Sequence, residues 1–133
     1  MPCEIAFSKK LQSLDHGDYI NECCIGGDVV ASCLLPALAA RYGEQEPGEE
    51  DWGWFIWFDH AGVRLAIDIF CDDPETGAYR IHLTSSTRGW LRQAVRDTPE
   101  LEVLRETVVA ALSEWLGYVP DVQPLDKNHD PIG

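Results

Sequence analysis

Residues 52–84 read WGWFIWFDHAGVRLAIDIFCDDPETGAYRIHLT, and this stretch decides the fold. It contains three runs rich in aromatic and β-branched residues, 52–58, 63–71 and 78–84, with turn residues between them. The runs predict three antiparallel strands joined by two hairpin turns, which is a meander. In the first run both alternating sets of side chains are apolar, so we expect a central strand that is covered on both faces.

The second and third runs alternate between apolar and polar residues. If the apolar sides pack on helices, the opposite face of the sheet carries Arg64, Asp68, Arg80 and His82, beside Phe70 and one side of the tryptophan run. A candidate ligand face consists of Asp68, Arg80, His82 and Trp57. Its charged groups could hold a small polar or anionic ligand, an indole could stack on that ligand, and a histidine titrates near neutral pH. The alternative is a half-solvated face whose charges form cross-strand pairs of little consequence.

Three segments outside the meander have helical patterns. From Asp28, a candidate N-cap, apolar residues recur at helical spacing as far as Gly43, and Pro36 predicts a kink or a break within this helix. Thr98 predicts the start of a helix whose apolar stripe runs as far as Gly117. Residues 85–97 also have helical spacing, with an arginine stripe along one side formed by Arg88, Arg92 and Arg96.

The two ends of the chain add extended segments. Residues 3–7 predict an edge strand and residues 18–25 a further extended segment, whereas the proline-containing residues 121–133 predict a surface or disordered tail. The expected fold is α+β, with an antiparallel sheet of three to five strands that packs against two or three helices on one face. A chain of 133 residues fits one domain, residues 1–133.

The charge of the chain restricts its partners. Lys and Arg number 10 against 23 Asp and Glu, which gives a formal net charge of −13. Such a charge repels nucleic acid and anionic lipid unless the positive groups are gathered on one face. The sequence has no run of about 20 apolar residues that could cross a bilayer, and its start lacks the pattern of a secretory signal. We therefore expect a cytoplasmic protein.

The cysteines and histidines form no metal-binding pattern. The four histidines share no ligand spacing, and there is no C-x-x-C pair among the five cysteines, Cys3, Cys23, Cys24, Cys33 and Cys71. We expect the thiols to be ordinary packing groups in a reducing compartment, and we expect no metal and no cofactor.

Carboxylates are concentrated in two loops, residues 44–51 (EQEPGEED) and 72–75 (DDPE). A charge run is usually a solvated loop, but the charge of the whole chain favours recognition of a basic partner, because complementary fields accelerate association. The candidate partner-binding residues are Glu44, Glu46, Glu49, Glu50, Asp51, Asp72 and Asp73. One or two of the tryptophans beside the acidic loop could act as aromatic anchors. The alternative is that all five, Trp52, Trp54, Trp57, Trp90 and Trp115, belong to the core.

The segment 51–54 (DWGW) has a physical explanation that needs no ligand. Asp51 would pin the loop that enters the sheet, and Gly53 would let another backbone or ring come close. The indoles of Trp52 and Trp54, expected on the same side of the strand, would pack over that gap. We therefore interpret this segment as a folding signature.

A resemblance to known bacterial proteins rests on the stretch 19–86. With Ile20, Asn21, Gly26 and Asp28 at a helix entry and E-D-W-G-W at residues 50–54, it resembles a family of small bacterial proteins with no assigned activity. That resemblance implies a shared fold. In size, charge and aromatic content the chain also resembles immunity proteins that neutralise bacterial toxins.

These features together predict a protein that binds another protein and is not an enzyme. We expect an immunity protein or inhibitor that covers a basic surface on a partner such as a toxin. The alternative is a small-ligand module or minor enzyme that uses the face with Asp68, Arg80 and His82. Mimicry of nucleic acid ranks below both, because the carboxylates are clustered in loops and not spread along one extended face.

Overall fold

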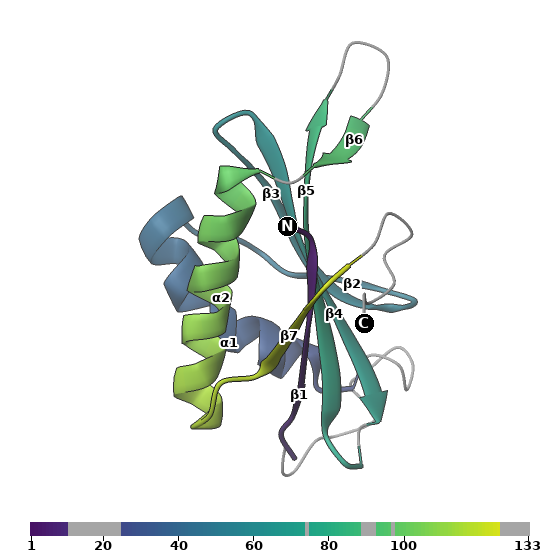
Figure 1. Cartoon of the computed structure of the whole chain (residues 1–133). Coiled ribbons are helices and arrows are strands. Elements are labelled where there is room, and N and C mark those ends of the chain that lie inside the picture. The colour runs from purple at the N-terminus through teal and green to yellow at the C-terminus, as the bar shows by residue number, and fades with distance from the viewer. Residues whose placement is uncertain (11–24, 74, 89–92, 97, 126–133) are drawn as a thin grey trace.

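The computed structural model describes residues 1–10, 25–73, 75–88, 93–96 and 98–125. Along the chain the elements are β1 (Cys3–Ser8), α1 (Gly27–Tyr42), β2 (Gly48–Glu50), β3 (Gly53–His60), β4 (Val63–Asp73), β5 (Ala78–Arg88), β6 (Gln93–Arg96), α2 (Pro99–Leu116) and β7 (Asp121–Pro124). Both helices lie on one side of the sheet (Figure 1). No helix of the described residues covers the other side, which we call the open face.

The strands form one seven-stranded antiparallel sheet in the order β2-β3-β4-β5-β1-β7, with β6 paired to β5. The α+β class and the helices on one face are confirmed, and two helices are present in the described residues. The expectation of three to five strands is too low. The strands it missed are short: β2 has 3 residues, and β6 and β7 have 4 each. Such strands are defined by their partners and not by a periodic pattern of their own.

The meander β3-β4-β5 is confirmed and forms the centre of the sheet. The β3–β4 hairpin turns at Ala61 and Gly62, which both have positive φ (54° and 78°). Positive φ at both central residues is the geometry of a type I′ turn, which matches the twist of the flanking strands. The resulting register places Ile56, Ile67 and Leu83 side by side against the helices, where each is fully buried.

β3 is not covered on both faces, so that expectation is wrong. Ile56 and Phe58 are buried on the helical side, but Trp57 is 46% exposed on the open face. The aromatic residues on the second side of this strand therefore form a surface and not a second core.

Trp52 and Trp54 lie on opposite sides of the sheet, which corrects the expectation that they share one side. Trp54 packs against Gly27 of α1, where an added Cβ would lie 2.3 Å from the indole. Trp52 contacts Phe70, with ring centroids 5.3 Å apart, and is 36% exposed. Trp52 precedes β3 and lies in the turn, so the alternation of the strand does not apply to it.

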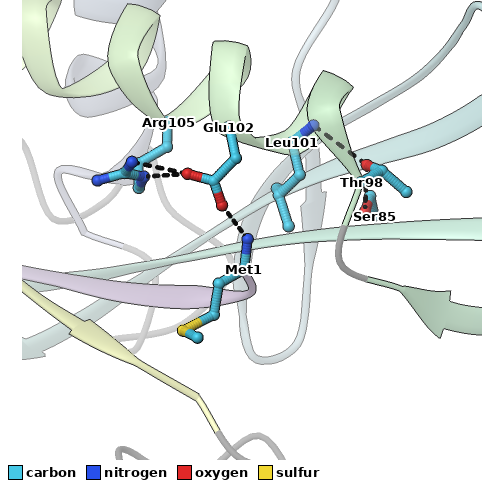
Figure 2. Close-up of polar contacts among 6 residues, drawn as sticks. All are labelled: Met1, Ser85, Thr98, Leu101, Glu102 and Arg105. Atoms are coloured by element: carbon cyan, nitrogen blue, oxygen red, sulfur yellow. Dashed lines mark hydrogen bonds and ion pairs between the residues drawn. The ribbon is translucent and has the colours of Figure 1, made fainter.

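α2 begins and ends where the sequence predicts. Thr98 is the N-cap: its Oγ1 accepts a hydrogen bond from Leu101 N (3.2 Å) and its hydroxyl donates to Ser85 Oγ (2.9 Å), which joins the helix start to β5 (Figure 2). Gly117, in the left-handed conformation, ends the helix. The stripe that faces the core consists of the buried residues Leu101, Leu104, Val108 and Leu112.

α1 is confirmed, with a change at its start. Gly26, in the left-handed conformation, is the N-cap, and Asp28 lies in the first turn. A carboxylate there still interacts favourably with the positive end of the helix dipole. The helix continues through Pro36 as one element, so it does not break into two short helices.

The helix expected over residues 85–97 is absent from the described residues, and two paired strands lie there. β5 continues to Arg88, and β6 pairs with it in the register Ser85↔Arg96 and Arg88↔Gln93. Arg88 and Arg96 therefore lie on two different strands and not on one helical stripe, while Arg92 lies outside the described residues. Pairing with β4 and β6 overrode the helical spacing, because the hydroxyl residues of 84–87 fit a strand equally well.

The two ends of the described chain pair with each other. β1 is an interior strand between β5 and β7, and not the expected edge strand. Residues 121–124, expected within a tail, form the edge strand β7, and Leu125 after it is only 5% exposed. Residues 18–24 and 126–133 lie outside the described residues. No helix in the described part of the chain is long and apolar enough to span a membrane.

Candidate functional site: the open face of the sheet

The register of the sheet arranges the open-face side chains in rows across the strands. The central row consists of Phe55, Asp68, His82, Glu4 and Gln123. The row on one side of it consists of Trp57, Ala66 and Thr84, and the row on the other side consists of Phe70, Arg80, Ala6 and Asp121. The four residues that the sequence placed on a ligand face, Asp68, Arg80, His82 and Trp57, therefore lie on one face in adjacent rows.

Aromatic rings cover the β3 side of this face. The ring centroid of Phe55 lies 4.4 Å from that of Trp57 and 6.3 Å from that of Trp52, and Trp52 reaches Phe70 at 5.3 Å. Gly48 on β2 makes room for this arrangement, because a Cβ there would lie 2.4 Å from the Phe55 ring. We call the four rings of Trp57, Phe55, Trp52 and Phe70 the aromatic strip.

Trp57 is the most exposed ring of the aromatic strip, at 46%. Its Nε1 donates a hydrogen bond of 2.7 Å to Asp68 Oδ1, which fixes the orientation of the indole on the sheet. Its neighbours in the same row, Ala66 and Thr84, are small. The indole is therefore oriented by a carboxylate, and its neighbours on β4 and β5 are small side chains that rise less far from the sheet.

Arg80 is held by two carboxylates and one ring. Its Nε and Nη2 donate to Asp72 (2.8 and 3.0 Å), its Nη1 donates to Glu4 Oε1 (3.2 Å), and its guanidinium lies 5.0 Å from the centre of the Phe70 ring. The hydrogen bonds to Asp72 are the main cause that raises the pKa of Arg80 above its usual value. The positive charge of Arg80 is therefore matched within the protein.

His82 is 9% exposed and shares the same acceptor as Arg80. Its Nε2 forms a hydrogen bond of 3.0 Å with Glu4 Oε1, and its ring contacts Phe70 edge-on at 5.0 Å. Glu4 itself is 8% exposed, so a nearly buried carboxylate joins β1 to β5. Sequence reasoning missed Glu4, because the polar position in the weak alternation of residues 3–7 did not reveal which strand lies beside it.

The second arginine of the face, Arg64, is also paired. Its Nε donates to Asp59 Oδ1 at 2.7 Å, across the β3–β4 pair near the hairpin turn. This hydrogen bond is the largest cause that raises the pKa of Arg64 above its usual value. Arg64 and Arg80 are thus neutralised by carboxylates of the same face, and Asp68 and Asp121 add further negative charge to it.

The carboxylates predicted to bind a partner lie in different settings. Glu44 and Glu46 are exposed in the connection between α1 and β2, and Glu50 and Asp51 are exposed at the β2–β3 turn, next to Trp52. Glu49 pairs with Trp54 in register and is partly buried.

The two remaining carboxylates of that prediction have contacts within the fold. Asp72 binds Arg80 as described above. Asp73 Oδ1 accepts hydrogen bonds from the backbone N–H groups of Glu75 (3.0 Å) and Thr76 (3.4 Å), which shapes the turn before β5.

Gly53 behaves as the sequence predicted. A Cβ at Gly53 would lie 2.1 Å from the carbonyl oxygen of Ile69, so only glycine lets β4 come this close. The motif 51–54 therefore brings the turn residue Trp52 onto the open face and Trp54 onto the helical side within three residues.

Three hollows of the described surface lie away from the open face. A groove of 1310 Å³ runs between α1 and α2 and is lined by residues that include Cys33, Arg41, Glu114 and Trp115. A second hollow lies against α1 near Glu44 and Glu46, and a third lies near Met1 and Glu102. None of these three hollows is lined by residues of the rows described above.

The described thiols lie in or beside the core. Cys3 and Cys71 are buried in it and Cys33 packs against it, as expected for ordinary packing groups. Burial raises the pKa of the Cys3 thiol to about 11. Cys23 and Cys24 lie outside the described residues.

Comparison with known proteins adds no assignment: no family model, no curated protein and no solved structure matches this chain.

Proposed function

We propose that this chain is a small acidic protein of the cytoplasm that binds another protein through its open face, as an immunity protein or inhibitor does. The partner presents a basic surface, such as the active site of a toxin. Covering that surface blocks it, and no bond is made or broken.

The observation that carries this proposal is the composition of the open face. Trp57 and Trp52 remain 46% and 36% exposed in a face on which Arg64 and Arg80 are already paired with carboxylates of that face. Protein interfaces concentrate binding energy in aromatic anchors that are enclosed by polar residues. An exposed aromatic strip in acidic surroundings is therefore complementary to a basic protein surface.

The whole-chain charge supports the same partner. A formal net charge of −13 on 133 residues attracts a basic protein over a range of about 10 Å at moderate ionic strength. This attraction raises the association rate, while the aromatic strip slows dissociation by excluding water.

The hydrogen bonds of the open face disfavour the alternative function, a small-ligand module or minor enzyme that uses this face. Arg80, which would bind an anion, is held by Asp72 and Glu4, and His82, which would transfer protons, is bonded to Glu4 and is 9% exposed. A ligand would have to displace these contacts. A basic protein needs only the exposed rings and carboxylates.

The proposal is tested with paired baits. Wild-type chain, Trp57→Ala and Val103→Ala are immobilised and exposed to the native lysate and to the purified products of the neighbouring genes. Val103 is the matched control, because it is an apolar residue on α2 that is 37% exposed on the helical side.

We expect a basic protein that binds the wild-type chain and Val103→Ala, binds Trp57→Ala at least about tenfold more weakly, and is released by salt. An acidic partner contradicts the proposal. So does a partner that is retained by Trp57→Ala and lost by Val103→Ala, because binding would then use the helical side.

A further inference from the structure

The rings of the aromatic strip are inclined to one another. The Phe55 ring makes an angle of 38° with both Trp57 and Trp52, and the Trp52 ring makes an angle of 41° with Phe70. Inclined rings cannot present one flat surface, so the strip is stepped, with a recess between neighbouring rings. Trp57 and Trp52 are exposed, and Phe55 and Phe70 are partly buried. The strip therefore offers a succession of apolar contacts to an elongated ligand.

The open face presents side chains and not backbone groups to a partner. The N–H and C=O groups of a sheet lie near its plane and pair between strands, so they do not project from its face. Of the polar side chains in the rows, Arg80 and His82 are already bonded to Glu4. A chain segment that crosses the aromatic strip therefore gains little by pairing its own N–H groups, and it must keep them in water or lack them.

Polyproline II is the backbone conformation that suits such a surface. It makes no internal hydrogen bonds and stays solvated, and proline has no N–H group at all. Because the conformation exists before binding, little conformational entropy is lost when it docks on aromatic rings. An added β-strand, by contrast, needs the edge of a sheet and not its face, and an amphipathic helix needs a hydrophobic groove.

Negative charge lies beside the aromatic strip. Glu50 and Asp51 are exposed at the β2–β3 turn, next to Trp52. The formal net charge of −13 extends the same field over the rest of the chain. A segment that binds here should therefore carry basic residues among its prolines, because both the long-range field and the carboxylates of this turn attract them.

We infer that the aromatic strip binds a basic, proline-rich segment of the partner in the polyproline II conformation. This inference rests on the proposed function and specifies which kind of segment the partner presents. Its prolines pack on the rings of Trp57, Phe55 and Trp52, and its basic residues lie towards the acidic β2–β3 turn.

The test uses three peptides of equal length, with the repeats proline-proline-arginine, alanine-alanine-arginine and proline-proline-glutamate. Each peptide is titrated by calorimetry at low salt into the wild-type chain, Trp57→Ala and the control Val103→Ala, after circular dichroism has shown that each variant is folded. We expect the proline–arginine peptide to bind the wild-type chain about tenfold more tightly than the other two. Trp57→Ala should weaken this peptide by at least about fivefold and leave the alanine peptide unchanged, and Val103→Ala should change neither.

A second variant extends the test to the other end of the strip. Trp52→Ala removes the ring on the other side of Phe55 from Trp57 and should also weaken the proline–arginine peptide. If neither tryptophan variant weakens it, the aromatic strip is not the binding site and the inference is refuted.

The peptides separate failure of the inference from failure of the proposed function. If the two arginine peptides bind equally and salt weakens both, recognition of proline is refuted while recognition of a basic partner stands. If the glutamate peptide binds as tightly as its arginine counterpart, or if no peptide binds, the basic partner chemistry of the proposed function is refuted together with the inference.

Discussion

Trp54 and Trp57 lie three residues apart on β3 and face opposite sides of the sheet, so their alanine variants should differ in stability. Trp54 packs on Gly27 and on the core, where truncation of a large aromatic side chain costs about 3–5 kcal/mol. Because Trp54 is only partly buried, we expect the lower end, about 3 kcal/mol. Trp57 is 46% exposed. Trp57→Ala removes one ring contact and one exposed hydrogen bond, which should lower the free energy of unfolding by about 1 kcal/mol.

Urea unfolding followed by circular dichroism measures the free energy of unfolding of both variants. The slope of that free energy against urea concentration should equal that of the wild-type chain. For a domain of this size each kcal/mol lowers Tm by about 4 °C, so the expected decreases are about 12 °C for Trp54→Ala and about 4 °C for Trp57→Ala. Equal losses, or a larger loss for Trp57→Ala, would mean that Trp57 is a core residue. The open face would then not exist as described.

Three further stability predictions follow from backbone geometry, capping and charge. Gly53→Ala should lower the free energy of unfolding by about 3 kcal/mol, because its Cβ would meet a backbone carbonyl at 2.1 Å. Gly62→Ala should lower it by only about 1 kcal/mol, because Gly62 has positive φ but open space around it. Similar urea midpoints for the two variants would refute the close approach at Gly53. Thr98→Ala should cost about 1–2 kcal/mol by removing the N-cap of α2, and an unchanged thermal midpoint would show that the cap is dispensable. Hydrogen bonds from the terminal amino group and from Arg105 lower the pKa of Glu102, so its stabilisation is present above the unfolded pKa near 4.5 and is lost as pH falls through the lower folded pKa. Glu102→Gln should therefore be less stable than the wild-type chain at pH 7, by under about 1 kcal/mol, and equal to it near pH 2; a difference that does not change with pH would contradict this.

The parts of the fold that the sequence predicted correctly have strong local signals. The meander follows from turn residues between apolar runs, and α2 follows from its N-cap at Thr98 and its terminator at Gly117. The remaining strands could not be predicted in this way, because a strand of three or four residues is defined by its partner. β7 exists because β1 pairs with it, although its own sequence is that of a surface tail.

The candidate site shows the same division. Alternation along β4 and β5 was sufficient to place Asp68, Arg80 and His82 on one face. It did not reveal Glu4, which reaches His82 across 78 residues of sequence. The aromatic content of β3 led to the wrong expectation of burial on both sides, because ring-rich strands occur both in cores and at binding surfaces, and only the position of the helices distinguishes the two cases.

The prediction of an arginine stripe on a helix is wrong for a related reason. Spacing of four between Arg88, Arg92 and Arg96 fits a helix, but it says nothing about the pairing opportunity that β5 offers to residues 93–96. Because β5 already extends to Arg88, its edge offers backbone N–H and C=O groups as hydrogen-bond partners. A strand formed beside β5 pairs with these groups, whereas a helix would pair its backbone groups only within itself.

The central claim, that the open face binds a basic protein, is tested most directly by the indole N–H signals of the chain in a proton–nitrogen NMR spectrum. The signals are assigned with single Trp→Phe variants and followed while the basic partner, or octa-arginine in its place, is added. We predict shifts for Trp57 and Trp52 and none for Trp54 and Trp115, which lie on the helical side. Shifts confined to Trp54 and Trp115, with Trp57 and Trp52 unchanged, would contradict the claim.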